Sequence, residues 1–113
     1  MGIFKKLFGI KKPEHAVIVH FLFGLNDLSP IFALEDQLES AISNAGVGEY
    51  DGNELAADGS DGILYMYGPD GDRLFDVIRP ILELSPFMKG AKVIIRYGPP
   101  TVNTRQREVI IGA

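Results

Sequence analysis

Polar side chains that could bind a ligand gather in two glycine-containing turns of this chain of 113 residues. The first turn follows Phe23, the second follows Tyr67, and a predicted helix starts soon after each of them. We expect the two strands that end there to run parallel, which would bring both turns to one edge of a sheet. Carboxylate and amide oxygens in such a cluster suit a hard cation better than an anion. The candidate ligand-binding residues are Asn26, Asp27, Asp70, Asp72 and Arg73.

The alternative is that these residues cap helices and form turns, roles for which Asp and Ser are preferred. The segment Asp70-Gly71-Asp72 lacks the further ligands and the closing Glu of a calcium-binding loop. A second acidic group surrounds a predicted hairpin, where Asp-Gly pairs are typical of turns. A divalent ion or solvated turn residues would both suit that group, and we predict no metal site. The group comprises Asp51, Glu54, Asp58 and Asp61.

The distribution of charge favours a protein partner. Between Glu14 and Glu83 fourteen acidic residues face two arginines, a net charge of −12, whereas the segment from Lys89 onward carries +4. An acidic middle repels nucleic-acid phosphate, so we expect no nucleic-acid binding. The basic residues near the C-terminus could pair with the acidic middle of a second copy, which predicts a homodimer. The candidate partner-binding residues are Asp51, Glu54, Arg96, Arg105 and Arg107.

Motifs for catalysis and cofactor binding are missing from the sequence. There is no cysteine, and therefore no thiol nucleophile or thiolate ligand. Neither Ser29 nor Ser85 lies in a Gly-x-Ser-x-Gly elbow, and the segment Gly68-Pro69-Asp70-Gly71 lacks the Lys and the Ser or Thr of a phosphate-binding loop. Beside an acid, His20 could act as a general base, but its apolar neighbours favour a packed, hydrogen-bonded histidine, while His15 is expected to be exposed. We predict no catalytic residue and no cofactor.

The spacing of apolar residues predicts the order β-α-β-β-α-β, followed by a fifth apolar run. We expect Ser29 to cap the first helix, Gly46 to end it, and Pro80 to kink the second helix. Two Tyr-Gly-Pro turns, at Tyr67 and Tyr97, are interpreted as strand ends on opposite edges of the sheet. The predicted ranges are Ala16–Phe23, Pro30–Ala45, Glu49–Ala57 as an edge strand with a bulge, Ile63–Tyr67, Arg73–Leu84, Val93–Tyr97 and Glu108–Ile111.

This order is that of a ferredoxin-like α+β sandwich, with an antiparallel sheet, two helices on one face and an extra C-terminal strand. The fifth run could pair with an edge of the same sheet or with a second chain. The hairpin Gly48–Gly52 and the turn Tyr67–Asp70 also resemble those of small uncharacterised bacterial proteins with a ferredoxin-like fold. That resemblance implies the fold alone, because no reaction and no functional residue comes with it.

Two regions are predicted: a basic amphipathic segment at residues 1–13 and a single domain at residues 14–113. The first region interleaves lysines with apolar residues, which would allow weak contact with an anionic membrane surface through residues 1–12. It has neither the long apolar stretch nor the small-residue cleavage site of a signal peptide. No run approaches the roughly 20 apolar residues needed to span a bilayer, so we expect a cytoplasmic protein.

The sequence favours a non-catalytic binding or interaction protein, self-associating or similar to an immunity protein that blocks a basic toxin. Electrostatic steering by the acidic middle would favour such a basic partner. The alternative is a small-molecule sensor or enzyme, with its pocket at the edge where the first and third strands are expected to end together.

Overall fold

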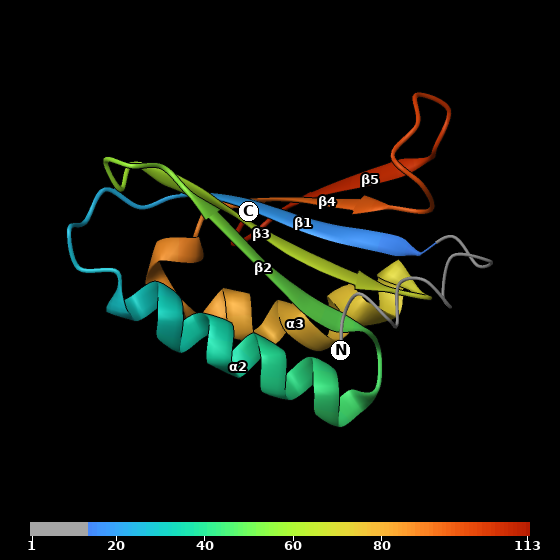
Figure 1. Cartoon of the computed structure of the whole chain (residues 1–113), viewed down its shortest axis with the longest axis horizontal. Helices are drawn as coiled ribbons and strands as arrows, with labels where there is room; N and C mark the ends of the chain where they lie inside the picture. The colour runs from blue at the N-terminus through green and yellow to red at the C-terminus, as the bar shows by residue number, and fades with distance from the viewer. Residues whose placement is uncertain (1–13) are drawn as a thin grey trace.

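The computed structural model describes residues 14–113, and the predicted segment 1–13 with its membrane contact lies outside the described residues. A five-stranded sheet of order β2-β3-β1-β4-β5, antiparallel throughout, carries both α-helices on one face (Figure 1). The fold is the predicted α+β sandwich, consistent with a ferredoxin-like arrangement. Its elements are β1 (His15–Leu22), α2 (Ser29–Ala45), β2 (Glu49–Leu55), β3 (Asp61–Gly68), α3 (Gly71–Leu84), the 3-10 helix η1 (Pro86–Met88), β4 (Lys92–Arg96) and β5 (Gln106–Ile110).

The core lies between the sheet and the two helices. Alternate residues of each strand point to one face, so Val17, Val19 and Phe21 of β1 are buried beneath the helices. Burial of such a side chain contributes about 1.5–3 kcal/mol relative to exposure. The helical layer meets them with Ile31, Leu34, Leu38 and Ile42 of α2 and with Leu74, Phe75, Ile78 and Leu82 of α3.

The predicted direction of the third strand is wrong. β3 runs antiparallel to β1, with Leu22 opposite Asp61 and His15 opposite Gly68. The physical reason is the hairpin between β2 and β3: it reverses the chain, while the crossover through α2 leaves β1 and β2 parallel. The two candidate ligand-binding turns therefore lie at opposite ends of the sheet, Asn26 and Asp27 at one, and Asp70, Asp72 and Arg73 at the other. The single pocket expected from them does not form.

The same reversal corrects the placement of the Tyr-Gly-Pro turns. β3 and β4 both flank β1 and run antiparallel to it, so they are parallel to each other. Tyr67 and Arg96 both pair with Ala16. The two turns therefore lie at the same end of the sheet, on either side of the start of β1.

Several local predictions are confirmed. β2 is an edge strand with a bulge between Tyr50 and Gly52. Of the two alternatives left open for the fifth apolar run, the structure has β5 paired with β4 of its own chain. The left-handed φ of 65° at Gly46, which glycine adopts without strain, ends α2. The side chain of Asp70 accepts a hydrogen bond from the backbone N–H of Arg73 and caps α3.

The start of α2 differs from its prediction. Ser29 does not cap the helix, because the cap position falls on Leu28, which has no side-chain bond there. Instead the carboxylate of Asp27 accepts from the backbone N–H of Ser29 at 2.9 Å. α3 runs through Pro80, which lies inside the helix.

Candidate functional site

The face of the sheet opposite the helices is covered by no described element from residue 14 onward (Figure 1). We call it the open face. It carries the side chains that alternate with the buried ones, so the strand register orders them in rows across the sheet. The first row is Glu49, Tyr67, Ala16, Arg96 and Gln106; the second is Gly52, Tyr65, Ile18, Ile94 and Glu108; the third is Glu54, Ile63, His20, Lys92 and Ile110; and the fourth is Asp61 with Leu22.

The centre of the open face is apolar except for His20. Ile18, Ile63 and Ile94 occupy neighbouring strands and are partly exposed. Leu22, near the end of β1, is 76% exposed. Isolated exposed apolar residues are ordinary, but a contiguous group on a sheet face that none of the described elements covers is typical of an interaction surface.

His20 lies in the middle of this face and forms a pair with Asp61, whose Oδ2 is 2.8 Å from Nε2 of the histidine. The hydrogen bond agrees with the prediction, but the packed environment does not, because 44% of the His20 side chain is exposed. Asp61, one of the acidic residues around the hairpin, therefore belongs to β3, and its side chain is bonded to a residue of β1.

A shallow groove of about 360 Å³ runs along the open face between β2 and β3. Within it the hydroxyl of Tyr65 donates to Oε1 of Glu54 at 2.6 Å. This hydrogen bond to a carboxylate raises the pKa of Tyr65, because ionisation would place two negative charges side by side. The groove is lined by Asp51, Gly52, Asn53, Glu54, Tyr65 and Tyr67, two of which are the predicted partner-binding carboxylates.

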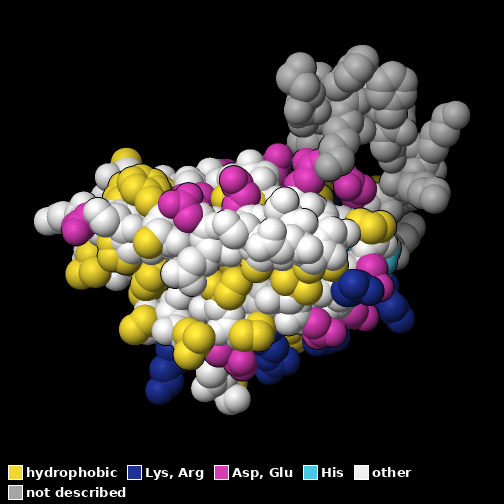
Figure 2. All heavy atoms as spheres, turned by 90° about the horizontal axis from the view of Figure 1, so that it is seen from below, with side chains coloured by type: hydrophobic (Ala, Val, Ile, Leu, Met, Phe, Trp, Pro, Cys, Tyr) yellow, Lys and Arg dark blue, Asp and Glu magenta, His cyan; other side chains and the backbone are white. Residues whose placement is uncertain are grey.

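Charge is separated across the molecule. The β2 side of the sheet carries Glu49 and Glu54 on the open face, and α2, which packs under that side, has three acidic residues and no lysine or arginine. On the other side β4 presents Lys92 and Arg96. Figure 2 looks onto the helical layer: acidic side chains predominate along one long side, whereas Lys and Arg lie toward the opposite one, with further acidic side chains among them.

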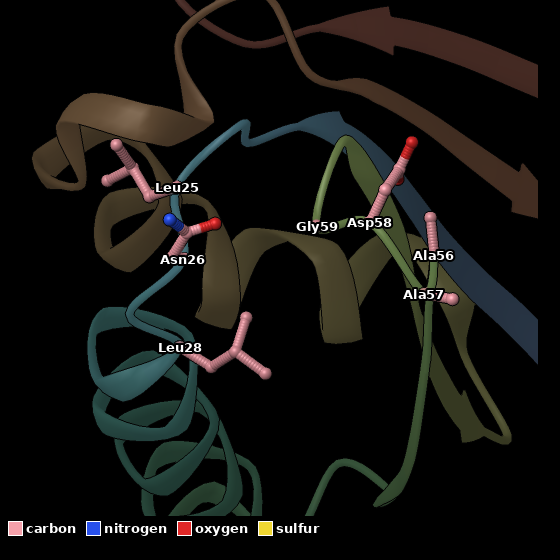
Figure 3. Close-up of a pocket in the computed structure, with 7 residues that line it drawn as sticks. All are labelled: Leu25, Asn26, Leu28, Ala56, Ala57, Asp58 and Gly59. Carbon is pink, nitrogen blue, oxygen red and sulfur yellow. The ribbon is translucent and has the colours of Figure 1, made fainter.

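A small cavity of about 190 Å³ lies at the end of the sheet where β1 leads into α2 (Figure 3). One wall consists of Leu25, Asn26 and Leu28, and the other of the turn from Ala56 to Gly59. Of the predicted ligand-binding residues, only Asn26 lines it. The carboxylate of Asp58 on the facing wall accepts from the backbone N–H of Ser60, and hydrogen bonds from the side chain and then the backbone of Ser60 lower the pKa of Asp58.

Asp27 lies beside this cavity without lining it. Its hydrogen bonds to Ser29 lower its pKa, so it acts as a turn former, as the alternative interpretation proposed. Two backbone hydrogen bonds join the loop after β1 to the turn before β3. The N–H of Phe23 donates to the carbonyl of Ser60 at 2.9 Å, and the N–H of Gly24 donates to that of Gly59 at 2.7 Å. The cavity is too small and too sparsely polar for the ligand sites of proteins, which usually measure about 300–1,000 Å³.

The opposite end of the sheet holds a network that the sequence analysis missed. Tyr97 donates to Oδ1 of Asp72 at 2.5 Å, and Nη1 of Arg107 lies 3.1 Å from the same oxygen. The bond to Asp72 raises the pKa of Tyr97. The guanidinium of Arg105 lies 4.6 Å from the centre of the Tyr97 ring. All three predicted partner-binding arginines thus contact groups of their own chain, since Nε of Arg96 donates to the carbonyl of Gly98 at 2.9 Å.

His15 belongs to the same end and is half-buried, contrary to the prediction that it is exposed. Its Nδ1 accepts a hydrogen bond from the backbone N–H of Gly71 at 2.9 Å, which satisfies one of the free donors at the start of α3. Its ring also meets the ring of Tyr97 edge-on, with centroids 5.5 Å apart. The repeated Tyr-Gly-Pro sequence was the signal that could have found this network.

Within residues 14–113, no three His, Cys, Asp or Glu side chains lie close enough to hold a metal ion. No helix in the same range is long and apolar enough to cross a membrane.

No protein-family model and no curated protein matches the sequence. Among solved structures, the chain is similar to Rv0793 from Mycobacterium tuberculosis, with a TM-score of 0.57 and 16% identity, over 80% of this chain and 99% of that one. It is less similar to PH0061, with a TM-score of 0.41 and 18% identity, over 96% of this chain and 72% of that one. The first likeness supports the fold alone, and the second supports no conclusion.

Proposed function

We propose that this protein is a non-catalytic interaction protein that self-associates through the open face of its sheet. The observation that carries the proposal is the contiguous apolar centre of that face, left uncovered by every described element. Two-fold homodimers are the commonest assemblies of soluble proteins, and two sheets can pack face to face with their side chains interdigitated. A cytoplasmic location is part of the proposal.

Edge-to-edge pairing is a poorer route to a dimer. If β5 paired with its copy about a two-fold axis through Glu108, the two Glu108 side chains would oppose each other; moving the axis to Arg107 would oppose two arginines. Like charges directly opposite each other destabilise a strand pair. The other edge, β2, carries a bulge and several carboxylates, which are the features that discourage edge pairing.

A basic partner protein is the second candidate, supported by the groove that Glu54 and Tyr65 line. Its carboxylates and aromatic rings would suit a lysine or arginine side chain. Self-association has the stronger support, because it also uses the apolar centre of the open face, which a salt-bridged basic partner alone would leave exposed.

Light scattering across a concentration series tests the proposal. We expect a dimer in the wild type and a monomer in Ile18→Glu and Leu22→Glu, because each change places a charge inside the apolar centre. Leu84→Glu is the matched control: Leu84 is 84% exposed at the end of α3, away from the open face. Circular dichroism checks that each variant folds.

A wild type that stays monomeric at hundreds of micromolar would contradict the proposal. So would folded Ile18→Glu and Leu22→Glu variants that both remain dimeric.

A further inference from the structure

We infer that two copies pack open face to open face with their two-fold axis parallel to β1. The strand β3 of each copy then lies over the basic strand β4 of the other, and the acidic strand β2 lies over β5. This inference rests on the proposed function and adds to it the orientation of the partner. It is carried by the order of charges across the sheet.

A face-to-face dimer has two simple choices for its axis, since the axis must lie in the plane between the two sheets. An axis perpendicular to the strands places every strand over its own copy, β2 over β2 and β4 over β4. An axis parallel to β1 exchanges the two sides of the sheet, which places β3 over β4 and β2 over β5 of the partner.

The perpendicular axis opposes like charges when it passes through any of the first three rows. It would stack the β2 strands, which carry Glu49 and Glu54 on the open face, and the β4 strands, which carry Lys92 and Arg96. An axis through the second row would also place Glu108 over its own copy. Like charges brought together in an interface cost several kcal/mol.

The axis parallel to β1 places no like charges directly opposite each other, because Glu49 lies over Gln106, Glu54 over Ile110 and Glu108 over Gly52 of the partner. It keeps each row over the same row, so that Tyr67 lies over Arg96, Tyr65 over Ile94 and Ile63 over Lys92 of the partner. Arginine stacks favourably on aromatic rings, and apolar side chains meet in the second row. Ile18, on the central strand, lies over its own copy.

The charge of the underlying helix supports the same choice. α2 lies beneath the β2 side and contributes Glu35, Asp36 and Glu39 with no basic residue. The whole β2 side is therefore negative, and it would be attracted to the side of a second copy that carries Lys92 and Arg96. Complementary potentials of this kind select the orientation in which two proteins dock.

The absence of cysteine from the sequence makes cross-linking a direct test. Ile18→Cys should cross-link to itself under the axis parallel to β1, and also under a perpendicular axis that passes through the second row. Tyr65→Cys mixed with Ile94→Cys should give a cross-linked dimer only for the axis parallel to β1. The linker should span about 8 Å, because facing sheets lie about 10 Å apart, too far for a direct disulfide.

The second pair, Ile63→Cys mixed with Lys92→Cys, repeats the test in the third row should one variant of the first pair fail to fold. Leu84→Cys gives the background from random collision. We expect a product of twice the monomer mass in both mixtures and its loss when any of these four variants is treated alone.

The inference is overturned if Tyr65→Cys and Ile94→Cys each cross-link to themselves while their mixture gains no product beyond those. In that case Ile18→Cys still cross-links and the proposed function stands. If Ile18→Cys, each of the other four variants treated alone and both mixtures all stay at the level of Leu84→Cys, the proposed function fails together with the inference.

Discussion

The hydroxyl of Tyr50 donates a hydrogen bond to Oε2 of Glu35, which joins the edge strand β2 to the helix α2. The same oxygen accepts from Nδ2 of Asn53 at 2.8 Å, so two residues of β2 hold one carboxylate of the helix. β2 contains a glycine and a bulge and few apolar residues. Its attachment to the domain therefore depends on this polar contact as well as on its ladder with β3.

Replacing Tyr50 by phenylalanine should lower the free energy of unfolding by about 0.5–1.5 kcal/mol, the usual net contribution of one hydrogen bond. The ring stays in place, and Glu35 keeps its bond to Asn53, so the loss should not exceed that range. Urea denaturation measures it. Tyr65→Phe is the matched control, because Tyr65 donates to Glu54 on the exposed face and should cost less. Equal losses in the two variants would contradict a special role for Tyr50.

Alkaline titration should show three tyrosines that ionise late. The pKa of Tyr50 is raised first by burial and then by Glu35, and those of Tyr65 and Tyr97 are raised by hydrogen bonds to Glu54 and Asp72. Absorbance of tyrosinate against pH measures this. Tyr50→Phe should remove the last group to titrate. Asp72→Asn should return the pKa of Tyr97 toward its ordinary value near 10, and an unchanged curve in that variant would be evidence against the assigned cause.

The same shifts make stability depend on pH. A tyrosine whose pKa is higher in the folded state holds its proton more tightly there, so its contribution is complete below the unfolded-state value of about 10. It is lost as the pH rises from there through the folded-state pKa. The urea midpoint should therefore fall above about pH 10, and it should fall less steeply in Tyr50→Phe. A midpoint that is flat in this range would contradict the assignment.

The elements of this fold follow from the sequence because their apolar periods are strong, and Gly46 and Asp70 end and start helices as their residue types predict. The prediction of the candidate ligand-binding site was wrong for one reason, because β3 runs antiparallel to β1 and not parallel to it. Strand direction is set by how many times the chain reverses, not by the residues in the strand, and the hairpin before Asp61 supplies the reversal. Contacts such as that of Tyr97 with Asp72 join residues far apart in sequence, so no pattern within one element predicts them, although the repeated Tyr-Gly-Pro sequence marks the two turns that meet there.

Pro80 should make α3 less stable than it could be. It lies inside the helix, lacks a backbone N–H, and leaves the carbonyl of Asp76 without its usual donor. Pro80→Ala should raise the free energy of unfolding by about 1–3 kcal/mol, since proline costs about 3 kcal/mol relative to alanine in a helix interior. Part of that gain is offset by the larger entropy of the unfolded alanine chain.

The matched control is Pro86→Ala, at the first position of η1, where proline is tolerated. It should be neutral or slightly destabilising. Thermal denaturation of the two variants would contradict the argument if both shifted the midpoint upward by the same amount.

Gly71 is required by the close approach of α3 to the sheet. A Cβ added there would lie 2.8 Å from Cγ2 of Ile95 and 3.1 Å from Cβ of His15. Gly71→Ala should therefore cost about 1–3 kcal/mol, the usual range for overpacking. In the background of Ile95→Ala the added methyl has room, so the double variant should lose less than the two single losses combined. Additive losses would mean that the clash with Ile95 is not the cause.

Salt should weaken self-association if charge complementarity orients the two copies. Raising ionic strength from about 0.01 M to 1 M shortens the Debye length from about 30 Å to 3 Å, which screens the attraction between the β2 side of one copy and the β4 side of the other. The dimer dissociation constant, measured by sedimentation, should rise several-fold. Lys92→Glu should weaken the dimer and reduce its salt dependence, because Lys92 lies on the open face. Lys89→Glu makes the same charge change outside the rows of that face and should keep the wild-type response. A dimer that tightens with salt would point to apolar contact alone and remove the electrostatic basis for the orientation of the axis.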